Sequence, residues 1–250
     1  MNYDLYRKSL FGGVSGFIST TIIYPFDTLR SILQNSKLHN KIDVIKNIKP
    51  INFYNGYLFN LTYVIPEKAL KIGINDYLVK ENEHRFKYKT TNHIVSGSIA
   101  GFLQSFITTP AELIKIRKQI GNYNNYIDII KSTKNLYRGL QFTILRDIPF
   151  SGIFFPLYYS LNDNLRIKNN FAKNITAGLG AGIVATIVAT PVDVIKTRYQ
   201  ISDTVKFKKI LNDVLKEKVL FRGIIPRIIS IASLYSITMA VFELQKNYFL

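Results

Sequence analysis

Three long stretches of the sequence contain no charged side chain. They cover residues 9–26, 94–111 and 174–192 and are 18, 18 and 19 residues long. A helix needs about 20 largely apolar residues to cross the hydrocarbon core of a bilayer. The stretches also contain glycine and threonine, which are common where helices pack in lipid. We therefore expect three membrane-spanning helices here, and the alternative is a soluble bundle of buried helices.

Three shorter uncharged stretches alternate with the long ones, at residues 50–66, 148–162 and 228–242. Each reaches spanning length only by including ionisable residues, which are Glu67, Lys68, Lys71, Arg146, Asp147 and Arg227. A charge at bilayer depth is costly and usually faces a polar cavity or a partner. The sequence therefore predicts six transmembrane helices, three of which carry such charges.

The excess of positive charge lies on one side of the predicted membrane. The chain has 33 Lys and Arg against 16 Asp and Glu, a net charge of +17. The connections 27–55, 112–138 and 193–222 carry +3, +4 and +4, whereas both ends and the two other connections together carry +4. Under the positive-inside rule, the three long connections share one side and both termini lie on the other. Nucleic-acid binding would need the basic residues on one soluble face, so we expect no nucleic-acid partner.

The composition excludes several kinds of chemistry. The chain has no cysteine, which excludes disulfide scaffolds, thiol catalysis and cysteine-based zinc sites. There is no glycine-rich phosphate loop, and no Ser-His-Asp arrangement is suggested. The histidines have no metal-ligand spacing; they are His39, His84 and His93. We expect no enzyme, no cofactor and no metal site.

The chain repeats itself three times. Pro25, Pro110 and Pro191 align at spacings of 85 and 81 residues. Each proline is followed by an acid at +2, a base at +5 and a glutamine at +9. Glycines precede each proline by 13 and 9 positions; they are Gly12, Gly16, Gly97, Gly101, Gly178 and Gly182. Small residues spaced by four allow neighbouring helices to approach closely, so this face is expected to pack against another helix.

This threefold proline-acid-base-glutamine signature resembles the mitochondrial carrier family. The resemblance implies an all-α membrane protein with six transmembrane helices in three pseudo-symmetric repeats around a central cavity. The repeats are residues 1–88, 89–169 and 170–250, in one integral membrane domain. It also implies alternating-access exchange of a small anionic solute in the mitochondrial inner membrane, with the termini in the intermembrane space. Cardiolipin is the lipid partner it implies, and no obligate protein partner is expected.

The resemblance further implies a gate on the matrix side, built from the signature residues. A proline inside a helix bends it, so the charged groups after each proline are expected to converge. The implied pairs are Asp27 with Lys115, Glu112 with Lys196, and Asp193 with Arg30, braced by Gln34, Gln119 and Gln200. Substrate binding must supply the differential affinity that opens them. The alternative is that these charges lie at helix ends without a role in transport.

The opposite gate is expected to be weak. The family places an aromatic-acid-x-x-base pattern there, and only residues 242–246 fulfil it. Pairing around the ring gives Asp76 with Asn162, Tyr159 with Lys246, and Glu243 with Val79. None of these is an ion pair. We therefore predict a resting state with the matrix gate closed and the cavity open to the terminal side.

The candidate substrate residues are Tyr63, Lys71, Arg146, Asp147 and Ser230. Arginine and lysine bind phosphate or carboxylate groups, and the ring of Tyr63 offers a surface for a base. These features favour nucleotides and deoxynucleotides such as dATP, ATP, ADP and dTTP. Asp147 favours an amino acid instead, because a carboxylate binds an ammonium group. Arg146 and Asp147 neutralising each other, an ion or proton leak, and a non-transporting membrane scaffold are further alternatives.

Overall fold

The computed structural model describes residues 2–35, 54, 57–120, 126–133, 135–201, 212, 220–221 and 224–249. Among these residues there is no β-strand, and nearly all lie in helices. The helices are α1 (Asn2–Asn35), α3 (Tyr57–Glu81), α4 (Lys89–Ile120), α5 (Tyr126–Ser132), α6 (Leu140–Asn164), α7 (Asn170–Ile201) and α9 (Ile224–Phe249). The prediction of an all-α protein is confirmed.

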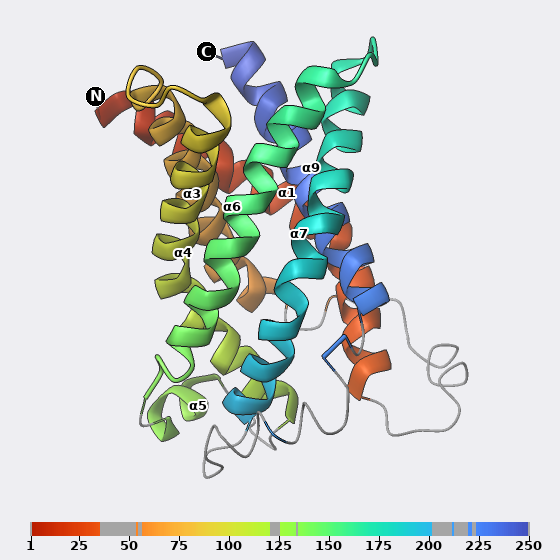
Figure 1. Cartoon of the computed structure of the whole chain (residues 1–250). Helices are drawn as coiled ribbons and strands as arrows, with labels where there is room; N and C mark the ends of the chain where they lie inside the picture. Colours follow the sequence, from red (N-terminus) through yellow and green to blue (C-terminus); the bar gives the residue numbers. More distant parts are fainter. Residues whose placement is uncertain are drawn as a thin grey trace.

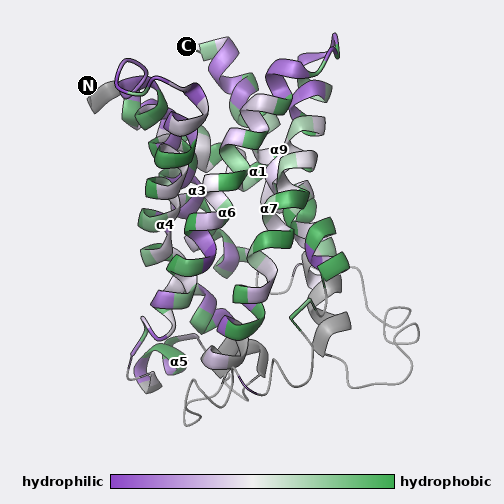
Figure 2. Ribbon diagram, in the orientation of Figure 1, coloured by the Kyte–Doolittle hydropathy of each residue, from purple (hydrophilic) through white to green (hydrophobic). Residues whose placement is uncertain are grey.

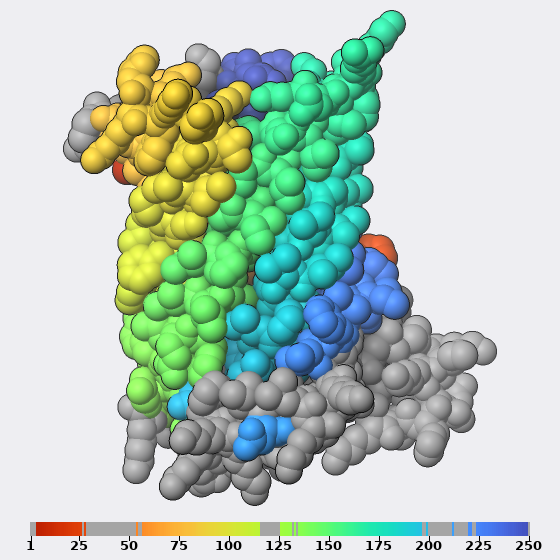
Figure 3. All heavy atoms as spheres, viewed as in Figure 1, coloured from red at the N-terminus to blue at the C-terminus, as the bar shows by residue number. Residues whose placement is uncertain are grey.

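The long helices form a closed ring in chain order. α1 packs against α3, α3 against α4, α4 against α6, α6 against α7 and α7 against α9, and α9 returns to α1. Both termini lie at one end of the bundle, called here the terminal end (Figure 1). The short helix α5 lies at the other end, called here the α5 end. On the face seen in Figure 3, α6 fills the space between α4 and α7.

Glycines bring the two long helices of each repeat into close contact. A methyl group on Gly101 of α4 would lie 2.5 Å from the backbone carbonyl oxygen of Asp147 in α6. On Gly178 of α7 it would lie 2.6 Å from the Cα atom of Ser236 in α9. Such distances leave room only for hydrogen. The glycine spacing thus predicts the contact between paired helices correctly.

The three signature prolines lie inside helices rather than at their ends. Pro25 is in α1, Pro110 in α4 and Pro191 in α7, and each helix continues beyond its proline. Proline lacks the backbone N–H that would bond one turn back, and it is a common cause of helix bends. These prolines remain the predicted positions of helix kinks.

The surface and the interior show the pattern of a membrane protein. Large apolar side chains are exposed along the ring; examples are Leu10, Phe17, Phe102, Phe106, Ile183 and Ile187. Charged side chains are buried inside; they include Glu67, Lys68, Lys71, Asp147 and Lys196. Hydrophilic residues gather at the terminal end, as Figure 2 shows. A soluble bundle would have the opposite arrangement.

Three described helices are long and apolar enough to cross a membrane. These segments are Asp4–Phe26, Asn170–Lys196 and Ile224–Phe249. The predicted span 94–111 is not among them, because serine, threonine and glutamine interrupt its apolar residues. The segment Ile224–Phe249 is apolar enough to cross a membrane although it contains Arg227. Polar residues in α3, α4 and α6 lie on the inner side of the ring, which lowers the overall hydropathy of these helices without exposing charge to lipid.

Candidate functional site

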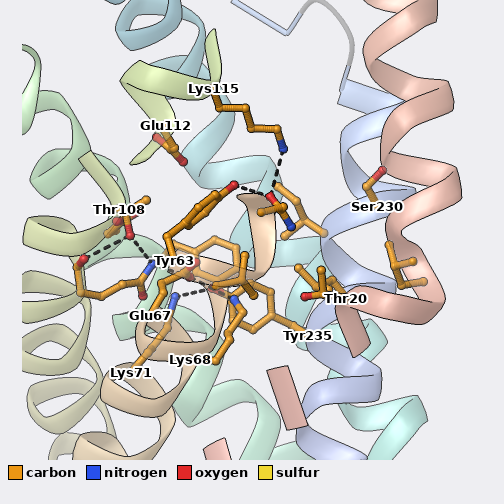
Figure 4. A pocket seen from close by; sticks show the side chains of 18 of the residues that line it. Thr20, Tyr63, Glu67, Lys68, Lys71, Thr108, Glu112, Lys115, Ser230 and Tyr235 are labelled. Atoms are coloured by element: carbon orange, nitrogen blue, oxygen red, sulfur yellow. Dashed lines mark hydrogen bonds and ion pairs between the residues drawn. The ribbon is translucent and has the colours of Figure 1, made fainter. Parts of the chain in front are cut away.

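A cavity of about 180 Å³ lies inside the ring, between α1, α3, α4, α6 and α9. All the predicted substrate residues line it; they are Tyr63, Lys71, Arg146, Asp147 and Ser230. Figure 4 shows three of them, Tyr63, Lys71 and Ser230, around the same space. The structure therefore brings together side chains that the sequence places up to 167 positions apart (63 to 230).

The described lining of the cavity is electropositive. Its cations are Lys68, Lys71, Lys115, Arg146 and Arg227. Its carboxylates are Glu67, Glu112 and Asp147. Five cations against three carboxylates give a net charge of +2. Such a lining attracts a small anion and disfavours a cation.

Arg146 is the centre of an ion-pair network toward the α5 end. Its Nε lies 2.6 Å from Asp147 Oδ1, and its Nη1 lies 2.9 Å from Glu112 Oε1 and 3.0 Å from Asp193 Oδ1. Glu112 also pairs with Lys196, as predicted. Arg227 pairs with the other oxygen of Asp193. The network joins α4, α6, α7 and α9, so it ties four helices of the ring together.

Asp147 is held in place by the helix contact described above. Its backbone carbonyl lies against Gly101, and Ser105 Oγ donates a hydrogen bond of 3.4 Å to Asp147 Oδ2. The predicted neutralisation of Arg146 by Asp147 is thus present as a direct contact. Because Arg146 also contacts Glu112 and Asp193, a ligand carboxylate at Arg146 competes with protein carboxylates.

Lys71 has a different environment at the other end of the cavity. Its side chain is 1% exposed, and its Nζ donates a hydrogen bond of 2.6 Å to the hydroxyl of Tyr235. The ammonium also lies 4.6 Å from the ring centroids of Phe150 and Tyr235. Within the described part of the chain, Lys71 contacts no carboxylate. By contrast, Lys68 lies 3.2 Å from Glu67 Oε1.

Comparison with known proteins agrees with this architecture. The family model for "Mitochondrial carrier protein" matches residues 2–82, 86–169 and 167–250, one match for each helix pair. The chain belongs to the mitochondrial carrier family. It is thus a membrane transporter and not an enzyme.

The relatives of this carrier include transporters of acidic amino acids. It is 34% identical to mitochondrial substrate carrier family protein X of Dictyostelium discoideum, over 98% of this chain and 92% of the relative. It is 32% identical to the mitochondrial aspartate-glutamate transporter AGC1 of Saccharomyces cerevisiae, and 29% identical to the human electrogenic aspartate/glutamate antiporter SLC25A13. Each alignment covers 98% of this chain but only 32% and 41% of those two relatives. These names give the nucleotide prediction no support.

Part of the predicted matrix gate of the carrier is described. The Glu112–Lys196 pair is present, and Lys115 Nζ lies 3.4 Å from Asn60 Oδ1. Other predicted members lie outside the described side chains; they are Asp27, Arg30, Gln34, Gln119 and Gln200. The pairs Asp27–Lys115 and Asp193–Arg30 therefore stay predictions. The cardiolipin prediction also concerns connections that lie mostly outside the described residues.

The gate at the terminal end differs from its prediction. Lys246 Nζ lies 2.8 Å from Asp76 Oδ1, and Lys8 Nζ lies 2.7 Å from Asp76 Oδ2. The prediction that this gate contains no ion pair was wrong. The structure also differs from the expected cavity open to the terminal side, because these ion pairs and buried side chains such as Phe154 and Phe242 close that end. Lys246 reaches Asp76 rather than Tyr159, and Lys8 comes from α1, outside the positions that the pattern compares. The Lys246–Asp76 contact joins two positions that the pattern compares, but in the opposite direction around the ring from the one assumed. The Lys8 contact lies outside the pattern altogether.

The other predicted members of this gate have different partners. Tyr159 stacks on His93, with ring centroids 4.3 Å apart. Glu243 Oε1 lies 3.8 Å from Lys246 Nζ. Asn162 Oδ1 has no hydrogen-bond partner among the described residues. The predicted pairs Asp76–Asn162, Tyr159–Lys246 and Glu243–Val79 are not seen.

Two residues of the site were singled out from the sequence but not assigned to the substrate or to a gate. Glu67 and Arg227 were expected to face a polar cavity or a partner, as charges inside predicted spans, and both line the cavity. Gln104, which donates a 3.0 Å hydrogen bond to Glu67, carries a weaker signal as a polar residue in such a span. Tyr235 carries none, since tyrosine is common in apolar stretches.

Proposed function

We propose that this carrier exchanges acidic amino acids, such as aspartate and glutamate, across the mitochondrial inner membrane. The proposal rests mainly on Lys71, a buried cation that faces the cavity. Among the described residues, its hydrogen-bond acceptor is the neutral hydroxyl of Tyr235. Burying a cation without a carboxylate is costly, so an anionic ligand gains free energy by completing the site. The similarity to aspartate/glutamate transporters over 98% of the chain supports the same substrate class.

The two ends of the cavity complement the two ends of such a substrate. An acidic amino acid carries two carboxylates and one ammonium group. Lys71 is suited to the side-chain carboxylate. Arg146 and Asp147 lie side by side, so one is suited to the α-carboxylate and the other to the ammonium group. Tyr63 and Ser230 also line the cavity and offer neutral hydroxyls.

A nucleotide fits the described cavity less well. The cavity of about 180 Å³ is smaller than the roughly 300–1,000 Å³ usual for drug-sized ligands. A nucleoside triphosphate would also need several uncompensated cations, whereas Lys68, Arg146 and Arg227 each contact a carboxylate. The electropositive lining suits a ligand with a small net negative charge.

Transport in this proposal follows alternating access. The ion pairs around Glu112, Lys196 and Asp193, with the predicted pairs Asp27–Lys115 and Asp193–Arg30, close the α5 end. This end is proposed to face the matrix, because the long connections carry most of the positive charge. The termini then lie in the intermembrane space. A substrate that binds Arg146 competes with Glu112 and Asp193, which weakens the network and favours opening.

Uptake into proteoliposomes tests the proposal. Vesicles are loaded with aspartate, glutamate, arginine, dATP or buffer, and uptake of labelled aspartate, arginine and dATP is measured. We expect aspartate uptake only into vesicles loaded with aspartate or glutamate. Uptake of dATP or arginine in place of aspartate would overturn the substrate class. Uptake into empty vesicles would favour a leak, and no uptake of any solute would favour a scaffold.

A matched pair of lysine variants tests whether Lys71 binds the substrate. Lys71→Gln removes the cavity cation, whereas Lys80→Gln removes a cation that is 69% exposed and pairs with Asp4 near the terminus. We expect Lys71→Gln to reduce aspartate uptake at least about tenfold, on the scale of a hydrogen bond to a charged group. Lys80→Gln should transport like the unmodified carrier. Equal uptake by the two variants would contradict the role of Lys71.

A further inference from the structure

Tyr235 lies where three helices of the ring meet. Its hydroxyl accepts the hydrogen bond from Lys71 of α3, and its ring centroid lies 5.0 Å from those of Phe150 and Phe154 in α6. Lys68 Nζ lies 3.8 Å from the centroid of the Tyr235 ring. Figure 4 shows Tyr235 beside both lysines at one side of the pocket. One side chain of α9 thus contacts both α3 and α6 across the cavity, although neither helix is next to α9 in the ring.

The layer beyond Tyr235 closes the cavity toward the terminal end. Phe154, Tyr158, Met239 and Phe242 are fully buried there and belong to the same packed cluster as Tyr235. None of these four residues lines the cavity. A path along α6 and α9 from the terminal end to the cavity therefore passes through this layer and reaches Tyr235.

We propose that the Lys71–Tyr235 hydrogen bond holds the empty cavity closed toward the terminal end, and that a substrate carboxylate opens it by taking Lys71. This inference rests on the proposed exchange of anions through the cavity. It adds a residue, Tyr235, that positions Lys71 and couples substrate binding to opening.

The chemistry of the two acceptors supports this coupling. A carboxylate binds an ammonium group more strongly than a neutral phenol does, because the hydrogen bond is charge-assisted on both sides. When Lys71 turns to the substrate, Tyr235 loses the hydrogen bond from Lys71. The polar link between α3 and α9 at this level is then weakened, because only Lys68 of α3 remains beside Tyr235. Opening without substrate would leave the Lys71 ammonium without an acceptor, which is costly in a buried site.

Substituting Tyr235→Phe isolates the hydroxyl. The ring remains, so its contacts with Phe150, Phe154 and the ammonium of Lys68 are kept. Tyr158→Phe is the matched control, because Tyr158 is also fully buried and its hydroxyl has no hydrogen-bond partner within the described residues. Both variants lose one buried hydroxyl, but only Tyr235→Phe breaks a contact with a cavity cation.

Because the sequence contains no cysteine, a single introduced thiol can report access to the cavity without any substrate present. Thr20→Cys places one thiol on the α1 wall of the cavity, where Thr20 is 4% exposed. Ile23→Cys gives a second reporter on the same wall. A membrane-impermeant maleimide is added at the terminal end of carriers in proteoliposomes of determined orientation, and the labelling rate is measured without substrate.

In each of the two cysteine reporters, we expect the thiol to be labelled on the order of tenfold faster when Tyr235→Phe is present. The comparison is with the same reporter carrying Tyr158→Phe or no further change. Equal labelling rates for Tyr235→Phe and Tyr158→Phe would overturn the inference. With aspartate present, labelling should accelerate in the unmodified background and change little in Tyr235→Phe. If uptake shows that aspartate is not transported, the substrate-free comparison still decides the role of Tyr235 separately from the substrate class.

Discussion

Lys246 of α9 and Asp76 of α3 form an ion pair of 2.8 Å at the terminal end, although they are separated by 170 positions in the sequence. Lys8 of α1 approaches the other oxygen of Asp76 at 2.7 Å. One carboxylate thus holds two ammonium groups from two helices, and both Asp76 and Lys8 are buried. The terminal end is closed by charge as well as by the aromatic packing beneath it.

Replacing Asp76→Asn should destabilise the carrier strongly. Lys8 and Lys246 both lose their nearer carboxylate at once and keep only the longer contacts with Asp4 at 3.4 Å and Glu243 at 3.8 Å. Removing one partner of a buried ion pair costs about 3–5 kcal/mol. Asp163→Asn is the control. Asp163 forms an ion pair with Lys89, the two side chains are 60% and 71% exposed, and such surface pairs contribute little to stability. Thermal unfolding in detergent measures both. An equal shift in Tm for the two variants would show that the buried network adds nothing.

Arg146→Lys should lower exchange at least about tenfold. The planar guanidinium contacts Glu112, Asp147 and Asp193 together, and a single ammonium cannot reproduce that geometry. Arg166→Lys keeps the charge in the same way at an exposed position between α6 and α7. Initial rates of exchange in proteoliposomes compare the two. Unchanged exchange in Arg146→Lys would mean that charge alone, without the fork of donors, is sufficient.

Glu112→Gln should lower the free energy of unfolding more than Lys196→Gln does. Glu112 accepts from both Arg146 and Lys196, so its loss affects two cations, whereas the loss of Lys196 leaves the Arg146 contact in place. The double variant should cost less than the sum of the single variants, since the two residues share a contact. A double-mutant cycle on the unfolding free energy measures this. Strict additivity would show that the two residues do not interact in the folded carrier.

Gly101→Ala should destabilise the carrier, and Gly180→Ala should not. The new methyl group at Gly101 would lie 2.5 Å from a backbone oxygen of α6, which cannot move aside without shifting Asp147. At Gly180 its nearest neighbour is the end of the flexible Leu161 side chain at 3.0 Å. Alanine also favours a helix by roughly 1 kcal/mol over glycine, so Gly180→Ala can gain stability. Tm values that fall equally would contradict the close contact.

Much of the fold follows from periodic features of the sequence. The repeat of prolines, glycines and charges predicts six long helices in three pairs, and the glycine contacts and the ring of helices agree. The predicted substrate residues do line one cavity. These successes share a cause: equivalent positions in three repeats face a common axis, so one pattern places three residues at once.

The contacts that the sequence does not reveal break this threefold symmetry. Lys8 and Asp76 come from non-equivalent positions, and so do Lys71 and Tyr235. Arg146 was predicted to bind substrate but also joins the ion-pair network, because its long side chain reaches two acids that follow prolines. Such contacts depend on side-chain length and on the local separation of helices. Neither quantity is encoded in a spacing pattern.

Because the ring closes between α1 and α9, any of the three repeats could come first in the chain. Arg7 donates a hydrogen bond to the backbone carbonyl of Phe249, and the ring centroids of Phe11 and Phe249 lie 6.0 Å apart. The first and last helices therefore meet as neighbours in the same way as the helices of adjacent repeats. Circular permutation, with residues 89–250 linked to residues 1–88, would preserve every helix neighbour in the ring. In such a molecule any of the three helix pairs can be synthesised first.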